Sequence, residues 1–358
     1  MKLAIHDCTS GFHPRWVAYC EKIGIPYKLV NCYSNDLIEQ LKDCKALMWH
    51  FNQGSHNDNI VAKQILFALQ HTGFVVFPDF RTAWHFDDKV AQKYLFESIG
   101  APLVPSYTFF DKKEALVWAE TTTYPKVFKL RSGAGSQNVR LVRTKQESSK
   151  LIIKAFGKGF PKYDSRGSLM DRIYMFRRGK MPFFEVLKGI IRLFYAPSYA
   201  RLGAKEVGYA YFQDFIPNNN SDTRIIVIDG KAFGLKRYVR DGDFRASGSG
   251  NFAWAKELFD ERCVKISFDI TSKLGLQVGA FDFVFDENHV PLIVELSYGF
   301  ASHVYDDCVG YWDLNLVWHE GKMIKEVWMV DLVLKQINEA QKEKSMVFSS
   351  LQSGSIKC

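Results

Sequence analysis

Short apolar runs alternate with helical patterns along the first part of the chain. LAIH, YKLVN, ALMWHF and FVVFP have the character of strands, and apolar residues recur at helical spacing near 14–24, 35–42 and 58–71. Strands that alternate with helices are typical of a parallel sheet with helices on its faces. We therefore predict an α/β fold that begins with an open parallel α/β domain over residues 1–85.

The next stretch combines one helix with a strand pair. Asp87 or Asp88 can cap a helix that runs to about Ser98. Further on, two predicted strands at about 126–131 and 139–143 flank the loop SGAGSQN. Backbone N–H groups of such a glycine-rich loop can bind phosphates, although a plain hairpin turn would have the same composition.

A lysine interrupts the first of these two strands. Lys129 alternates with Phe128 and Leu130, so it lies on the opposite face of the strand from them. We expect the two apolar side chains to face a core and the lysine to face a ligand or solvent.

The last third of the chain is predicted to form hairpins and helices. The strand YAYFQDFIP ends at Pro217, and the hairpin TRIIVIDGKAFGLKRYV follows it. Helices are predicted over 254–275 and 323–341, whereas the polar tail 342–358 lacks periodicity and is predicted to be disordered.

A second hairpin, GAFDFVFDENHVPLIVELS, carries two carboxylates. If its turn is centred between Asn288 and His289, Asp282 lies opposite Glu295 on one face, and the phenylalanines point to the other. Like charges in that arrangement repel, and a divalent cation is the simplest remedy, with Mg²⁺ suited to carboxylate oxygens. The alternative is an exposed edge strand whose acids are solvated.

Composition narrows the class of protein. The chain has 358 residues, 47% of them apolar and 24% charged, which suits a soluble protein of two or three domains. No apolar run is long enough for a transmembrane helix, and the first apolar stretch is too short for a signal peptide. The seven cysteines include no C-x-x-C pair, which favours buried thiols in a reducing cytoplasm.

The net charge of +8 is concentrated in residues 154–206. This insertion has twelve basic and four acidic side chains, an excess equal to that of the whole chain, and ten aromatic residues. Its segment 183–195, FFEVLKGIIRLFY, has the pattern of an amphipathic helix. Either its aromatics pack on the protein with a solvated basic rim, or the insertion docks on a large anionic acceptor or an anionic membrane surface.

Together these pieces, in this order, resemble the ATP-grasp superfamily over roughly residues 1–340. DDK, YPKVFKL and SGAGSQNV look like the lysines and the glycine-rich loop that this family places on nucleotide phosphates. FQDFI looks like the hinge strand that reads adenine, and SDTRIIVIDGKAFGLKRYVRDGDFRASGSGN is similar to part of the ribosomal-protein glutamate ligases. By that resemblance the nucleotide-binding residues are Lys89, Lys129, Ser132, Gly133, Gly135, Gln213, Asp214, Phe215, Ile216, Asp222 and Arg224.

The resemblance also implies catalytic and metal-binding residues. Arg237, Arg240 and Arg245 would act on the phosphates and the acyl substrate. AFDFVF and VELS match the metal strands, which makes Asp282, Glu295 and Ser297 the candidate ligands. The family usually has Glu-x-Asn where this chain has Glu295-Leu296-Ser297, and a serine hydroxyl is a poorer metal ligand than an amide oxygen.

The architecture implied is an ATP-grasp fold, in which two α+β subdomains that clamp ATP follow the N-terminal domain. The boundaries are a lid subdomain at 86–212, which contains the insertion, and a C-terminal subdomain at 213–341 with the metal site.

The activity implied is a carboxylate–amine ligase that requires ATP and Mg²⁺, with Mn²⁺ as a substitute. An acyl phosphate forms first, and an amine then displaces phosphate. A lipid-linked saccharide is one acceptor that the basic insertion would suit. The alternatives are an ATP-grasp kinase that phosphorylates a hydroxyl, a nucleotide-binding module degenerate at Ser297, and, less favoured, a nucleic-acid binder. We expect a cytoplasmic protein that could sit peripherally at the membrane, and a homodimer is left open.

Overall fold

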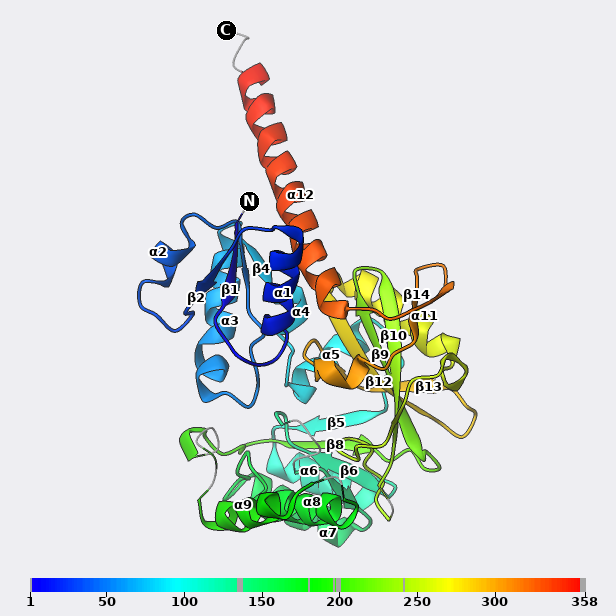
Figure 1. The fold of residues 1–358 in the computed structure, drawn as a ribbon. Coiled ribbons are helices and arrows are strands. Elements are labelled where there is room, and N and C mark those ends of the chain that lie inside the picture. Colours follow the sequence, from blue (N-terminus) through cyan, green and yellow to red (C-terminus); the bar gives the residue numbers. More distant parts are fainter. Residues whose placement is uncertain are drawn as a thin grey trace.

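The computed structural model describes residues 2–133, 138–179, 181–195, 197, 201–240 and 242–354, with only the backbone of 344 and 347–354. Three sheets organise these residues (Figure 1). Among the described helices, none combines the length and the apolar character needed to cross a membrane.

The N-terminal sheet is parallel, as predicted. Its strand order is β2-β1-β3-β4, and all three strand pairings are parallel. Gly24, which follows the first helix, adopts a left-handed conformation (φ +72°) that ends the helix. The elements are β1 Leu3–His6, α1 His13–Ile23, β2 Tyr27–Val30, α2 Leu37–Leu41, β3 Ala46–Met48, α3 His56–His71, β4 Val75–Phe77 and α4 Phe80–Ala83.

The second sheet has the order β5-β8-β6-β7 and is antiparallel. Phe128 and Leu130 contribute to the core between this sheet and its helices, whereas Lys129 points to the other face, as predicted from the alternation. The elements are β5 Ser106–Phe109, α6 Lys112–Thr121, β6 Lys126–Lys129, β7 Arg140–Val142, α7 Lys145–Ala155, α8 Ser165–Arg177, α9 Phe183–Phe194 and β8 Ala210–Asp214.

The third and largest sheet runs β13-β12-β9-β10-β14-β15, with β11 paired to β10. Both hairpins that the sequence predicts lie in it. Its elements, together with the helices beside them, are α5 Lys89–Ser98, β9 Ser221–Ile228, β10 Lys231–Tyr238, β11 Phe252–Ala253, η1 Lys256–Leu258, α11 Glu261–Leu274, β12 Val278–Phe285, β13 Pro291–Ser297, η2 Ser302–Tyr305, β14 Gly310–Trp312, β15 Trp318–Glu320 and α12 Lys325–Gly354.

The predicted register of the acidic hairpin is confirmed. Asp282 pairs with Glu295 and Ala280 with Ser297. The register shifts between Asp282 and Phe283, so Val294 is an extra residue in the partner strand, as in a β-bulge. Phe281 and Phe283 are buried in the core on the other face of the hairpin.

Three features cross the predicted domain boundaries at 86 and at 212. The core of the N-terminal sheet continues into residues of β9, β10 and α12, so the first domain and the third sheet share one hydrophobic cluster. Helix α5 lies within the predicted lid range but packs on the third sheet, with Phe96 in that core. Strand β8 straddles the second boundary, since it runs to Asp214 in the lid sheet.

The predicted helix over 254–275 is wrong in its first part. Among the described residues 254–260, the only helical element is the short 3₁₀ turn Lys256–Leu258, which follows the strand that pairs with β10. Helix α11 starts only at Glu261, because the Asp260 side chain accepts a hydrogen bond from the Arg262 N–H and caps the helix there.

The predicted disorder of 342–358 is also wrong as far as residue 354. Helix α12 continues to Gly354 and projects away from the body of the molecule (Figure 1). Its later residues include alanine, glutamine, lysine and glutamate, which favour helix without requiring an apolar face. Residues 355–358 lie outside the described part of the chain.

Candidate active site

A cavity of about 770 Å³ lies where the three sheets meet. The edge of the lid sheet, the polar face of the third sheet and the carboxyl ends of N-terminal strands all contribute side chains to its lining. A space of that size can hold a nucleotide together with a small substrate. Among the residues predicted to bind the nucleotide, those that line it are Lys89, Lys129, Gly133, Gln213, Asp214, Phe215, Ile216, Asp222 and Arg224.

Lys129 is a buried cation beside this cavity. Its Nζ donates a 2.5 Å hydrogen bond to the Gln213 side-chain oxygen, and no carboxylate lies in ion-pair distance among the described residues. Burial lowers the pKa of Lys129 to about 8, although the charge of Glu295 opposes that effect. A buried ammonium without a counterion is a favourable position for a bound anion.

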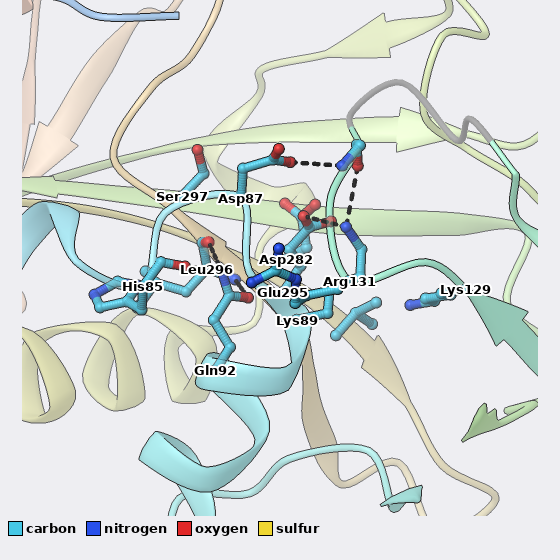
Figure 2. Close-up of polar contacts among 12 residues, drawn as sticks. His85, Asp87, Lys89, Gln92, Lys129, Arg131, Asp282, Glu295, Leu296 and Ser297 are labelled. Carbon is cyan, nitrogen blue, oxygen red and sulfur yellow. Dashed lines mark hydrogen bonds and ion pairs between the residues drawn. The ribbon is translucent and has the colours of Figure 1, made fainter. Parts of the chain in front are cut away.

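Lys89 lies in the first turn of α5 and is also buried (Figure 2). Its Nζ donates to the Gly133 carbonyl at 3.0 Å and lies 3.3 Å from Glu295 Oε1. Burial opposes its charge, but Glu295 and Asp87 outweigh burial and raise the pKa of Lys89. The Gly133 N–H donates to Asp87 at 2.8 Å, so the start of the glycine-rich loop is tied to the start of α5.

A network of arginines and aspartates forms the opposite wall. Arg224 lies directly across from Asp282 on neighbouring strands and donates to both its oxygens at 2.5 and 2.7 Å. Arg237 makes a similar bidentate pair with Asp222 and adds a 2.7 Å bond to Asp282. Burial alone would raise the pKa of Asp282, but the two guanidinium groups hold it well below its usual range.

These contacts change the argument for a metal ion. The hairpin carboxylates do face each other, but Arg224, Arg237 and Lys89 compensate their charges. Within the described residues, no three His, Cys, Asp or Glu side chains gather into a metal site.

The same contacts still leave room for one ion. Asp282 accepts three hydrogen bonds, which leaves about one of its four lone-pair sites, and Glu295 is about a third exposed with one cation beside it. Mg²⁺ usually takes one or two carboxylates and completes its shell with phosphates and water. The donor set therefore fits a single Mg²⁺ that arrives with a nucleotide.

Ser297, the third predicted ligand, lines the cavity but has local partners. Its hydroxyl donates to the Gly299 carbonyl at 2.8 Å and accepts from the Gly299 N–H at 3.1 Å. This turn orients the loop that follows β13.

Strand β8 and the residues after it form the predicted base pocket. Gln213 donates to Ser106 at 3.1 Å, and Asp214 pairs with Lys126 at 2.6 Å, so both side chains are held in place. Val104, Val127 and Val294, which alternation within apolar strands could have identified, add apolar surface to the lining. Phe215 and Ile216 line the same cavity, and we call the part of it lined by these apolar residues the apolar slot.

Arg240 and Arg245, two of the predicted catalytic arginines, lie in the loop after β10 but have different surroundings. Arg245 lines the cavity and pairs with Asp243 at 2.6 Å. Arg240 does not line it, because its guanidinium is buried between Asp171 of α8 and the Ser247 carbonyl. Its observed contacts hold the loop against the insertion.

Ser132 also lies outside the lining. Its hydroxyl donates to Glu206 at 2.6 Å, which connects the loop to the end of the insertion. Gly135 lies outside the described residues.

Side chains from the N-terminal sheet close the far end of the cavity. His50, Asn52 and Gln53 follow β3, and Ser10 and Arg15 follow β1. Their position at the carboxyl ends of parallel strands is where open α/β sheets bind ligands, and that signal could also have identified Ser10 and Arg15. Arg15 is held by Asp306 at 2.7 and 2.6 Å.

His50 is held in one tautomer at this end. Its Nδ1 accepts from the Phe12 N–H at 3.0 Å, so the proton of the neutral ring lies on Nε2. Burial lowers the pKa of His50 to about 4, and the ring stacks on Phe12. Gly11 must lack a side chain, since a Cβ there would lie 2.2 Å from His50 Nδ1. His50 is therefore a neutral hydrogen-bond donor.

Comparison with known proteins identifies the fold. A family model described as the RimK-like ATP-grasp domain matches residues 204–305, which contain β8, the arginine network and the acidic hairpin. A search of curated proteins found no relative that matches.

Solved structures agree over nearly the whole chain. D-cycloserine synthetase DcsG superposes with a TM-score of 0.57 at 13% sequence identity. The alignment covers 94% of this chain and 100% of the synthetase. A RimK domain ATP-grasp protein from Sphaerobacter thermophilus gives 0.54 at 14%, covering 93% and 100%. The D-alanine–D-alanine ligase from Bacillus anthracis, complexed with ATP, gives 0.52 at 13%, covering 96% and 99%. At such low identity these structures establish the fold alone, which is the ATP-grasp fold, and the RimK-like domain match over residues 204–305 supports membership of the ATP-grasp superfamily.

Proposed function

We propose that the protein is an ATP-dependent carboxylate–amine ligase. The observation that carries the proposal is that two buried lysines and the acidic hairpin line one cavity. Lys129 has a cationic side chain without an ion-pair partner in the described residues, which is what the phosphates of a nucleotide require. The similarity to ligases of the same fold supports the reaction class.

The residues divide into three groups in this proposal. Lys89 and Lys129 bind phosphates together with the loop that starts at Gly133, while Gln213 to Ile216 hold the base in the apolar slot. Asp282 and Glu295 would hold Mg²⁺, which supplies neutralisation of charge on the β- and γ-phosphates. Ser297 is at most a contact through water, since its hydroxyl bonds to Gly299.

Two steps then lead to an amide. A carboxylate oxygen of the acyl substrate attacks the γ-phosphorus, and the bond to the bridging oxygen of ADP breaks. The amine next attacks the acyl carbon of the mixed anhydride, phosphate leaves, and the amine loses a proton. Lys129 and Arg245 face the cavity where negative charge develops on the transferring group.

The acid and the amine are assigned to the end of the cavity formed by the N-terminal sheet. Ser10, His50 and Asn52 line that end, and the neutral His50 ring offers an N–H to a carbonyl or carboxylate oxygen. Binding both substrates next to the phosphates supplies the proximity that acyl transfer requires.

The deciding experiment is a screen of acids and amines for phosphate release, with mass spectrometry of the product. A ligase forms ADP and phosphate only when both substrates are present, and the product gains the mass of the amine minus water. Phosphate retained on a hydroxyl substrate would instead identify a kinase. ATP binding without turnover in the presence of any pair would identify a nucleotide-binding module.

A nucleic-acid binder predicts a different result. Its affinity would fall steeply with salt and would not depend on ATP. The fraction of oligonucleotide bound, measured with and without ATP over a salt series, separates that function from the ligase.

A further inference from the structure

Helix α9 of the insertion has a broad apolar face that the rest of the described protein does not cover. Its six outward apolar side chains are between 44% and 80% exposed. They are Phe183, Phe184, Leu187, Ile190, Ile191 and Phe194. Packing within the chain therefore accounts for Phe160 and Tyr163 of the insertion, which are buried, but not for this face of α9.

The arrangement around the helix axis explains this exposure. At 3.6 residues per turn the six side chains span roughly a third of the circumference. Val186 and Gly189 face another direction and are buried against α8. Gly189 lets α8 and α9 approach closely, since a Cβ there would lie 2.8 Å from the Arg172 side chain and 2.9 Å from that of Leu169. One face of α9 thus anchors it, and a second face remains free.

Basic side chains flank the exposed face. Lys188 and Arg192 lie beside it on α9, and Arg177 is the last residue of α8, directly after Phe176, whose ring packs on Phe183. Residues 165–195 contain seven basic and two acidic side chains. Glu185 pairs with Arg172 and Lys188, and Asp171 pairs with Arg240, so neither acid is left to attract a basic partner.

We propose that α9 docks the protein on an anionic lipid bilayer. Aromatic and aliphatic side chains on one face of a helix, flanked by lysine and arginine, match the acyl boundary and the headgroups of such a surface. Helices α8 and α9 lie at the end of the molecule far from the tip of α12, so a flat surface can approach them (Figure 1).

Charge favours a bilayer over a second copy of the chain. In a two-fold dimer the same patch would meet itself, so the basic flanks of both copies would lie close together and repel. An anionic leaflet accepts the apolar face and the basic flank at once.

The test is flotation of the full-length protein with phosphatidylcholine vesicles, with and without phosphatidylglycerol. The wild type should bind only the anionic vesicles, and added salt should weaken binding because exposed charges are screened. Phe184→Ser combined with Phe194→Ser should weaken binding by at least about tenfold, because both rings lose their apolar burial. Arg177→Glu combined with Arg192→Glu should have an effect in the same direction.

A matched control is Phe110→Ser, since Phe110 is 62% exposed and follows β5, outside the insertion. It should bind like the wild type. ATP binding should be the same in all these variants, which keeps the outcome independent of the proposed ligase activity. The proposal fails if the wild type ignores anionic vesicles at low salt, or if the paired serine variant still binds them fully. A dimer in sedimentation that the serine pair dissociates would also overturn it.

Discussion

The two walls of the cavity hold their positive charge in different ways. On the wall formed by β9, β10 and β12, Arg224 and Arg237 are locked to Asp222 and Asp282 by bidentate hydrogen bonds. On the wall formed by β6 and α5, Lys129 bonds only to an amide oxygen among the described groups. The first wall is electrostatically complete without a ligand, and the second is not.

This difference indicates that the two walls have different roles, one structural and one in ligand binding. A buried charge with a partner mainly fixes the local structure, because breaking the pair leaves the other charge unpaired. A buried charge without a partner is available to a ligand. Its lowered pKa shows that burial disfavours the charged form until a ligand binds. We therefore expect changes on the arginine wall to affect stability and changes on the lysine wall to affect ATP binding.

The largest effect is expected from Arg237→Met. The change leaves Asp222 without its bidentate partner and weakens the hold on buried Asp282, so the free energy of unfolding should fall by about 3–5 kcal/mol. Urea denaturation measures this. Arg262→Met is the control, because Arg262 makes a similar pair with Asp260 at the surface and should matter little. Equal losses in the two variants would contradict the structural role of the arginine wall.

The second largest effect is expected from Glu295→Gln. Glu295 belongs to the hairpin but contacts Lys89 on the other wall. Loss of this carboxylate removes the proposed metal ligand and the partner of Lys89, so turnover should fall about a hundredfold or more, about 2.7 kcal/mol. Phosphate release at saturating ATP and Mg²⁺ is the measurement, with Glu287→Gln in the exposed turn of the same hairpin as the control. Wild-type turnover in Glu295→Gln would leave the hairpin with a structural role only.

Lys129→Met tests the lysine wall directly. It keeps most of the side-chain stem and removes the charge, so ATP affinity should fall by about tenfold, about 1.4 kcal/mol. Calorimetric titration with ATP measures the change, and stability should change far less than in Arg237→Met, because one hydrogen bond to Gln213 but no ion pair is lost. Lys93→Met, which removes a lysine already paired with Glu97, is the matched control. An unchanged affinity in Lys129→Met would remove this lysine from the phosphate site.

The pKa of Lys129 predicts a pH dependence. Because burial lowers this pKa to about 8, the free protein loses the charge as pH rises through 8. Bound phosphates favour the charged form and raise the pKa, so ATP affinity should fall above pH 8 by at most about tenfold per pH unit. Proton uptake on binding, measured in two buffers of different ionisation enthalpy, should accompany this and vanish in Lys129→Met. A flat profile in the wild type would contradict the lowered pKa.

Ser297→Asn should give the smallest change. If this position contacts the ion only through water, an amide oxygen there should bring the half-saturating Mg²⁺ concentration down by less than about tenfold. Magnesium titration of ATP binding measures it. A marked loss of binding would instead mean that the hydroxyl contacts with Gly299 are needed to hold the loop.

Features with a local physical cause were predictable from the sequence. Periodicity gave the strands and helices of the first sheet, and a helix cap gave the start of α5 at Asp88. The sequence also predicted that Asp282 faces Glu295, although pairing next to the turn is one residue out of the predicted register and the bulge at Val294 restores the predicted pair. The alternation around Lys129 predicted which face of β6 carries the charge.

Features that depend on strand order or on packing came only from the tertiary structure. Strand β9 lies far from β12 in sequence, yet it places Arg224 opposite Asp282. The guanidinium compensates the carboxylate charge, and the repulsion between Asp282 and Glu295 was the reason to expect a metal. The burial of Arg240 by α8, the approach of His50 to the cavity and the exposed face of α9 likewise depend on which elements pack together. Side-chain sequence specifies local conformation directly, whereas the partners of a buried charge are decided by chain segments that meet only when the sheets assemble.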